Sequence, residues 1–274
     1  MKIAVIGAGN VATHLAPAFE KSGSGDVVQV YSRTKESAET LCRRLKDAIP
    51  VSNIADLTNE ADLYVISLPD HAANEIIEGI SRRMRDESRT GKWSSSLWVH
   101  TSGSLPLETL SAITPRPGVF YPLQTFSRSV DVDMSKVPIF IEAANEHDRT
   151  ILEEIAARIS SKVHYADGDL RKRMHIAAVF ACNFTNYMFT VADDLLRQDN
   201  LTLEVLNPLL EETVKKALAG NPAAGQTGPA VRGDMNIMST HASMLPESLS
   251  GIYRTLSEAI YNRHHPTDTT HEQN

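Results

Sequence analysis

Cysteine is scarce in this sequence, which has only Cys42 and Cys182 among its 274 residues, far apart and without the spacing of metal ligands. No disulfide framework is implied, and such low usage is typical of a reducing compartment. Positive charge is in deficit too, with 27 Lys and Arg against 34 Asp and Glu and a formal net charge of −7. Because nucleic acids are bound by clustered cations, this balance argues against nucleic acid as the main partner.

A secretory signal is also missing, since the chain runs from Met1 into a short apolar run and a glycine-rich turn. The most apolar stretch, residues 174–192, carries polar side chains and is closely flanked by charges. These features favour a buried core helix over a membrane span. The histidines from His264 onward are too few and scattered for a metal site. We therefore expect a cytoplasmic protein with no metal and no membrane association.

Short apolar runs alternate with helical patterns over residues 1–167, which is typical of a mostly parallel, doubly wound α/β sheet. A helix is expected over about 35–46, and strands are expected at 2–6, 27–31, 63–67, 97–101, 118–121, 137–141 and 162–165. Residues 168–264 carry helical signals alone, with helices over about 170–197, from Asn207-Pro208 onward, and along an apolar stripe from Leu249 to Ile260. The tail, 265–274, has no periodicity and is expected to be disordered.

A glycine-rich turn follows the first predicted strand. Residues 7–12 read Gly-Ala-Gly-Asn-Val-Ala, a GxGxxA pattern that opens a helix. The first glycine permits a tight turn, the second lets the backbone approach a pyrophosphate, and the alanine keeps helix and strand close. The helix N-terminus adds amide donors and partial positive charge. An ordinary strand–turn–helix is the alternative, but the flanking elements predict dinucleotide binding through Gly7, Gly9, Asn10, Val11 and Ala12.

The second predicted strand ends in Ser32-Arg33-Thr34 and lacks the Asp or Glu that NAD-binding proteins place there for the ribose hydroxyls. An arginine between two hydroxyls suits a 2′-phosphate, which a guanidinium binds with two hydrogen bonds. A solvated arginine at a helix start is the alternative. Ser32, Arg33 and Thr34 therefore predict NADP(H) as the cofactor.

Two more turns follow predicted strands, Leu68-Pro69-Asp70-His71 and His100-Thr101-Ser102-Gly103. Ligands of open α/β sheets bind outside the carboxyl ends of the strands, so both turns are expected to face the cofactor. Asp70 serves equally well as a helix N-cap, and His100 as a structural histidine. No nucleophile elbow surrounds Ser102, which argues against a hydrolase. The predicted cofactor contacts are Leu68, Pro69, His100 and Thr101.

These turns resemble the superfamily of β-hydroxyacid dehydrogenases, pyrroline-5-carboxylate reductases and ketopantoate reductases. Three later blocks resemble one branch of it more narrowly, the bacterial Rossmann-like proteins with a helical C-terminal domain that are usually labelled NADP oxidoreductases. The blocks are GVFYPLQTF (118–126), HIAAVFACNFTNYM (175–188) and QTGPAVRGD (226–234), followed by His241. The resemblance implies a helical domain like that of 6-phosphogluconate dehydrogenase, a cleft between the domains, and dimerisation through the helical half.

One departure from the superfamily affects the chemistry. Relatives that reduce keto or hydroxy acids commonly carry a catalytic Lys early in the first helix of the second domain, with Asn one turn later. Here His175 stands at that place, with Val179 one turn on and Asn183 a turn beyond, on one helical face. A histidine still protonates a carbonyl oxygen near neutral pH. We therefore expect His175, Asn183 and Ser102 to be catalytic, although hydrogen bonding to backbone or between helices is the alternative for the first two.

Substrate contacts are expected in two loops and on the same helix. The block 226–234 is interpreted as an ordered loop because glycine and proline break its periodicity. Arg232 is suited to a substrate carboxylate, but a structural Arg–Asp pair with Asp234 is the alternative, and Gln124 equally suits substrate or backbone. The predicted substrate contacts are Gln124, Asn186, Gln226, Thr227, Arg232 and His241.

Two function classes remain open. The first is an NADP(H)-dependent oxidoreductase that transfers a hydride to or from a small carbonyl, hydroxy or imine compound, with a 2-keto acid such as ketopantoate as one candidate. The second is a non-catalytic regulatory protein that binds NADP(H). The missing Lys favours the second, whereas the crowded polar blocks favour the first. A homodimer through the helical domain is expected, because the 170–197 helix is apolar over more than one face.

Overall fold

The computed structural model describes residues 1–86 and 93–266. By its internal contacts the chain divides into two compact units, a sheet unit, Met1–Tyr187, and a helical unit from Met188 onward. This division falls later than the predicted domain boundary at 167, because the first turns of the long helix pack on the sheet. Of the predicted tail 265–274, residues 267–274 lie outside the described residues.

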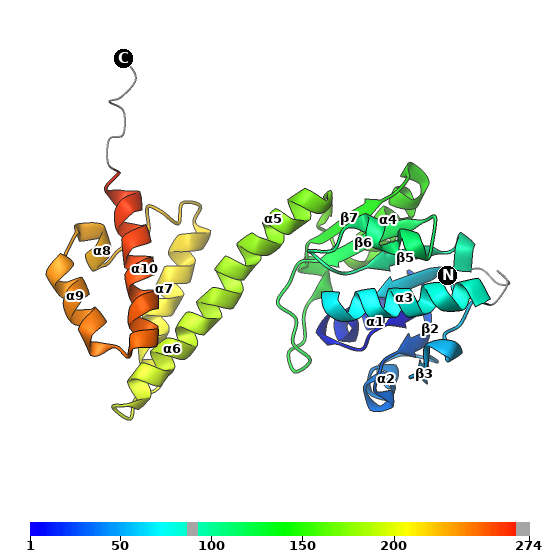
Figure 1. Cartoon of the computed structure of the whole chain (residues 1–274), viewed down its shortest axis with the longest axis horizontal. Coiled ribbons are helices and arrows are strands. Elements are labelled where there is room, and N and C mark those ends of the chain that lie inside the picture. Colours follow the sequence, from blue (N-terminus) through cyan, green and yellow to red (C-terminus); the bar gives the residue numbers. More distant parts are fainter. Residues whose placement is uncertain (87–92, 267–274) are drawn as a thin grey trace, which may run out of the picture. The chain divides into compact units, whose positions relative to one another are not determined.

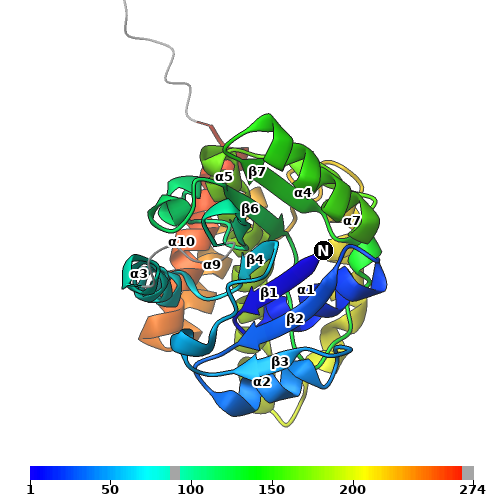
Figure 2. The same cartoon turned by 90° about the vertical axis from the view of Figure 1, so that its right-hand side faces the viewer.

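The described residues of the sheet unit form one sheet in the order β3-β2-β1-β4-β5-β6-β7-β8. Neighbouring strands are parallel except for the antiparallel pair β6 and β7. The strands are β1 (Lys2–Ile6), β2 (Asp26–Tyr31), β3 (Ile49–Val51), β4 (Leu63–Ile66), β5 (Leu97–His100), β6 (Pro117–Pro122), β7 (Ile139–Ala143) and β8 (Val163–Tyr165). Figure 2 looks across them from β3 to β7. The predicted doubly wound sheet is confirmed, with β3 as a short edge strand that the sequence pattern did not indicate.

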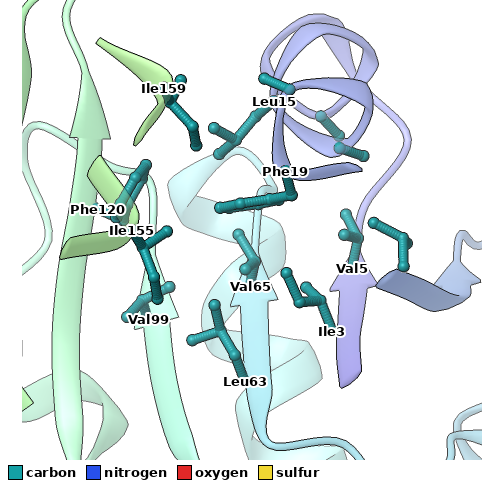
Figure 3. Packing of buried hydrophobic residues seen from close by; sticks show 14 of the residues in the cluster. Ile3, Val5, Leu15, Phe19, Leu63, Val65, Val99, Phe120, Ile155 and Ile159 are labelled. Carbon is teal, nitrogen blue, oxygen red and sulfur yellow. The ribbon is translucent and has the colours of Figure 1, made fainter. Parts of the chain in front are cut away.

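Alternation along the strands explains why helices cover both faces of this sheet. Ile3 and Val5 pack on one face with α1 (Asn10–Lys21), α2 (Lys35–Cys42) and α4 (Glu146–Ile159). Ala4 and Ile6 pack on the other with α3 (Asp70–Asp86). Figure 3 shows the first cluster, where Phe19 lies over the strands. Each large apolar side chain buried in this way contributes about 1.5–3 kcal/mol, so the sheet unit has a substantial core of its own.

The helix expected over 170–197 is present but not uniform. It consists of α5 (Gly168–Ala178), a π-helical segment (Val179–Phe184) and α6 (Thr185–Arg197). The prediction of a buried core helix is wrong for the single chain, because none of residues 174–192 is buried, and Phe180 is 65% exposed. Large apolar side chains of this helix, such as Phe184 at 50%, remain exposed in the part of the chain that the structure describes. Among the described residues, no helix is long and apolar enough to cross a membrane.

The helical unit also contains α7 (Asn207–Leu218), α8 (Pro229–Arg232), α9 (Met235–Met244) and α10 (Glu247–His264), which Figure 1 labels. The predicted start of α7 and the predicted last helix are confirmed. The block 226–234, expected to be a loop, contains the one-turn helix α8, because its glycines flank the turn rather than interrupt it. Within the described part of this unit only Ala230, Ala242 and Ser250 are buried, so no large apolar side chain is shielded there.

Candidate functional site

The glycine turn between β1 and α1 has room for only one residue type at its first position. Gly7 has φ +117°, and a Cβ there would lie 2.1 Å from the Ser67 carbonyl oxygen. Its amide donates to the Tyr31 carbonyl at 2.8 Å, which joins the turn to the end of β2. At Gly9, which caps α1, a Cβ would meet nothing within 4 Å. The backbone at Gly9 is therefore open to an approaching ligand, and the first turn of α1 has no acidic side chain to repel an anion.

The predicted cofactor-selecting residues, Ser32, Arg33 and Thr34, follow β2 at this same edge of the sheet. Thr34 donates to the Ser37 hydroxyl at 2.8 Å, across the start of α2. Arg33 is exposed and forms no ion pair with any residue that the structure describes. Its guanidinium is therefore available for an external anion beside the glycine turn.

A cleft of about 720 Å³ opens at the carboxyl ends of β1, β4, β5 and β6, within the sheet unit. In a doubly wound sheet the chain order reverses between β1 and β4, and ligands bind at such a point. Most of the predicted site residues in this unit lie on its wall, namely Gly9, Asn10, Val11, Leu68, Pro69, Thr101, Ser102, Gln124, His175 and Asn183. Asp70 lines it too, at the first position of α3. Gly7 and Ala12 are both buried and are not among the residues that line the cleft.

Ser102 holds the turn after β5 in shape. Its hydroxyl oxygen accepts the amides of Ser104 at 3.0 Å and Leu105 at 3.1 Å. His100 lies beneath the turn, 1% exposed, with Nδ1 accepting the Ser102 amide at 3.2 Å. Burial lowers the pKa of His100 to about 4, and the nearby Arg171 cation acts in the same direction. The His100 side chain is thus a neutral support for the turn and is absent from the residues described as lining the cleft.

His175 meets Tyr121 in the wall of the cleft. The Tyr121 hydroxyl lies 3.3 Å from His175 Nδ1, joining the end of β6 to α5. Burial raises the pKa of Tyr121, and Arg171 opposes that rise. A Cβ on Gly103 would lie 2.8 Å from Tyr121 Cζ and 3.1 Å from His175 Cβ, so the turn packs directly against both side chains.

A completely buried arginine holds α5 to the sheet. Arg171 pairs through Nη1 with Glu142 of β7 and donates to the Ala166 carbonyl at 3.2 Å. Its Nη2 donates to the Leu105 carbonyl at 2.8 Å. A buried charge is tolerated only when it is well paired, and here the partners come from β7 and from the turn after β5. This network fixes the start of α5, and with it His175, against the sheet.

The π-helical segment continues the wall formed by α5. Val179 and Asn183, expected on one helical face with His175, line the cleft beside it, and Cys182 lines it too. π-Helical turns inside α-helices are frequent at functional sites. Asn186, predicted to lie near the same face, is exposed and stands outside the described lining of the cleft.

The segment after β6 lies against the glycine turn. Arg128 Nη2 donates to the Ala8 carbonyl at 2.5 Å, and His14 Nε2 lies 2.8 Å from the Ser127 carbonyl. Gln124 uses its amide oxygen to accept the Thr125 amide at 2.8 Å, which is the backbone alternative, although Gln124 also lines the cleft. A cationic side chain is thereby fixed at the edge of the turn.

The other predicted substrate residues lie in the helical unit. Arg232 pairs with Asp234 at 3.3 Å, as the structural alternative proposed, and Gln226 donates to the Thr227 carbonyl at 3.2 Å. His241 Nδ1 lies 2.9 Å from the Tyr253 hydroxyl. The described residues include no group of His, Cys, Asp or Glu side chains arranged to hold a metal.

Three participants were not predicted from the sequence: Tyr121, Arg128 and Arg171. Arg171 sits among other charged residues at the start of a helix, and nothing in that pattern distinguishes a buried cation from a solvated one. Arg128 lies in a segment without periodicity. Tyr121 was the easiest to find, because it lies within the block 118–126 and is the last residue of a predicted strand.

Comparisons with known proteins agree with this architecture. A model of a Rossmann-like domain matches residues 1–124, and a model of a domain of unknown function, DUF2520, matches residues 137–260. The chain is 42% identical to a Bacteroides fragilis protein named a "putative NADP oxidoreductase", with 96% of this chain and 98% of that chain covered and a TM-score of 0.87. No protein of curated function matches.

Two more distant structures share the fold alone. The pyrroline carboxylate reductase of Plasmodium falciparum, solved with NADP bound, is 14% identical over 96% of this chain and 98% of that chain, with a TM-score of 0.56. The imine reductase of Myxococcus stipitatus, in complex with NADP⁺, is 15% identical over 96% and 92%, with a TM-score of 0.59. On the strength of the Bacteroides relative and the two domain models, the chain belongs to the family of Rossmann-like proteins that carry a C-terminal DUF2520 domain.

Proposed function

We propose that the protein is an NADP(H)-dependent oxidoreductase that transfers a hydride to or from a small carbonyl, hydroxy or imine compound. The observation that carries this proposal is the cleft that begins at the glycine turn and ends at a histidine on α5. Anion-binding backbone at one end and a proton-bearing side chain at the other are what hydride transfer to a polar double bond requires. The name of the Bacteroides relative agrees with this reaction class.

The chain's own residues fit NADP(H). The amides at the start of α1 would receive the pyrophosphate, where Gly9 leaves room for it and Arg128 supplies a cation at the edge of the turn. Arg33, between two hydroxyls, would receive the 2′-phosphate. The absence of a carboxylate in the sequence at the end of β2 also argues for NADP(H) over NAD(H).

His175 is the proposed proton donor. As the bound cofactor delivers hydride to the carbon, a proton must reach the oxygen or nitrogen of the substrate, and the donor must lie within hydrogen-bond reach of that atom. His175 lines the cleft, and Asn183, on the same wall, would orient the substrate. Ser102, whose oxygen is occupied by two backbone amides, would donate its hydroxyl hydrogen from the sheet side.

Absorbance measurements of NADPH oxidation test the proposal directly. A panel of 2-keto acids, ketopantoate among them, and cyclic imines is offered to the protein, and NADPH binding is measured in parallel by fluorescence. Turnover of at least one compound, with loss of turnover in His175→Ala, is the expected result. Failure to bind NADPH would overturn the proposal.

A non-catalytic NADP(H)-binding regulator is the second candidate. The observation that favours it is the histidine at the place where superfamily relatives carry lysine. In the same experiment this candidate predicts tight NADPH binding without turnover of any compound in the panel.

A homodimer through the helical unit belongs to the same proposal. In the described part of that unit, no large apolar side chain is buried, and an apolar groove of about 310 Å³ runs between α6 and α10, past Leu195, Ile252 and Leu256. A second copy that covers such surfaces would bury well over the roughly 800 Å² of a packing contact. Light scattering at micromolar concentration is expected to give the mass of a dimer, and a monomeric mass would contradict this.

A further inference from the structure

The contact between Tyr121 and His175 brings together two side chains from distant parts of the sheet unit. Tyr121 is the last residue but one of β6, His175 lies in the second half of α5, and both line the cleft. The tyrosine oxygen lies 3.3 Å from Nδ1, and the two rings meet at 65° with centroids 6.5 Å apart. Only one ring nitrogen of His175 is engaged by this contact, so the other, Nε2, is left for a ligand of the cleft.

Packing leaves this pair little freedom. A Cβ on Gly103 would lie 2.9 Å from the Tyr121 hydroxyl and 3.1 Å from His175 Cβ, so the backbone of the turn touches both side chains. Tyr121 is 8% exposed, and Phe140 of β7 lies against its other side with ring centroids 6.5 Å apart. The hydroxyl is thus directed by its surroundings rather than by the histidine alone.

The charges around the pair indicate which group donates. Burial keeps the Tyr121 hydroxyl protonated by raising its pKa, with Arg171 opposing. Arg171 is itself neutralised by Glu142, and the buried His100 stays neutral because its pKa is lowered to about 4. The Tyr121 phenol has a hydrogen to donate, and a His175 Nδ1 that carries no hydrogen of its own accepts it.

We propose that Tyr121 is a positioning residue that donates its hydroxyl hydrogen to His175 Nδ1 and thereby fixes the tautomer with the proton on Nε2. The proposal rests on the proposed function in taking His175 as the proton donor. During reduction, His175 Nε2–H gives its proton to the substrate oxygen or nitrogen. At the same time, His175 Nδ1 takes the hydroxyl proton of Tyr121. A water in the cleft then returns a proton to Tyr121 and restores the phenol form that burial favours.

Histidine tautomers are read directly from ring-nitrogen chemical shifts of ¹⁵N-labelled protein, which needs neither substrate nor turnover. The His175 signals are assigned by their loss in His175→Gln. In the wild type, a single tautomer with the proton on Nε2 is expected. In Tyr121→Phe, which keeps the ring packing, a population with the proton on Nδ1 should appear. Gly103→Ala should produce the same change without removing the hydroxyl group, because the added Cβ would push the two side chains apart.

The helical unit offers a matched control, since Tyr253 contacts His241 Nδ1 in the same way at 2.9 Å. Tyr253→Phe should change the His241 signals and leave those of His175 as in the wild type. Identical His175 signals in wild type and Tyr121→Phe, or a wild-type proton on Nδ1, would overturn the proposal.

Kinetics give a second readout once a substrate is known. Tyr121→Phe should lower kcat about tenfold with KM nearly unchanged, because proton delivery rather than binding is impaired. An unchanged kcat would also overturn the proposal. Failure of NADPH binding or of all turnover in the wild type would count against the proposed function instead, and the tautomer measurement would still decide the role of Tyr121.

Discussion

The sheet unit and the helical unit treat their apolar side chains in opposite ways. In the sheet unit, large side chains such as Phe19 and Trp98 are wholly buried on the two faces of the sheet. In the helical unit, Leu218 and Met244 are 81% and 77% exposed, although the helices themselves are regular. Regular helical backbone alone is therefore not enough to bury the large apolar side chains of this unit. The stability of the sheet unit comes from its own core, whereas under the proposed dimer that of the helical unit would come from burying the surface that one copy leaves exposed.

Truncating one apolar side chain in each unit tests this comparison with the largest expected effect. Phe19→Ala should lower the free energy of unfolding by about 3–5 kcal/mol, because it opens a cavity between α1 and the sheet. In a single copy, Leu218→Ala should change it by no more than about 0.5 kcal/mol, as expected for a surface position. Urea unfolding followed by circular dichroism measures both, and equal losses would show that Leu218 is buried in the protein as it exists in solution.

A second comparison concerns the roles of the two ends of the cleft, cofactor binding at the glycine turn and proton donation from α5. His175→Ala should lower kcat by about 10²–10⁴-fold, the usual contribution of a general acid. NADPH affinity should remain as in the wild type, since the phosphates are bound by the other end of the cleft. Steady-state kinetics and fluorescence titration separate the two effects. Near-normal turnover in the variant would remove His175 from the mechanism.

The buried side chain of His100 predicts that the stability of the sheet unit depends on pH. Burial lowers the pKa of His100 to about 4, while an unfolded chain protonates its histidines near 6.5. The unfolded state therefore gains a proton first, and stability is lost as the pH falls from about 6.5 to about 4, by as much as roughly 3 kcal/mol. Urea unfolding at a series of pH values should show this loss in the wild type and a flatter profile in His100→Gln. Parallel profiles would mean that His100 is protonated in the folded protein.

Substitutions of two arginines test which cofactor is bound. Their expected effects on binding are the smallest of those considered. The wild type should bind NADPH at least about tenfold more tightly than NADH, or roughly 1.4 kcal/mol. Arg33→Ala should remove most of that preference while sparing NADH. Arg128→Ala is the matched control, because loss of a pyrophosphate contact weakens both cofactors to the same degree. Equal titration of the two cofactors by the wild type would contradict the assignment of Arg33.

The sequence predicted the sheet well because the information is local. Strand alternation, the glycine turn and the polar residues after each strand are all read within a few positions, and the parallel order then brings Gly9, Thr101 and Ser102 to one edge. The short edge strand β3 was not predicted, because Ile49-Pro50-Val51 shows no alternation of apolar and polar residues. Its first residue is exposed. The start of α7 was predicted from Asn207-Pro208, and the helix does begin there, although Leu206 rather than Asn207 is at the cap position.

What the sequence did not predict depends on contacts between distant residues. The burial of Arg171 follows from Glu142, 29 positions earlier, and from the Leu105 carbonyl, 66 positions earlier. The Tyr121–His175 contact likewise spans 54 positions. The 174–192 stretch was expected to be buried because it is apolar. An apolar sequence indicates that a surface favours burial, but it does not indicate whether the same chain or another one buries it.

The π-helical segment, Val179–Phe184, makes the length of this helix as important as its composition. Each α-helical residue advances about 100° around the axis, and a π turn accommodates one residue more than an α turn. Deleting a single residue here, such as Ala181, would let the backbone return to regular α-helical hydrogen bonding and so relieve a local irregularity. The same deletion would leave Asn183 seven regular positions after His175, within about 20° of the same face, whereas a deletion in the regular turns of α5 would rotate the later residues by about 100°. Single-residue deletions should therefore disturb the cleft less within this segment than in the regular α-helical turns before it.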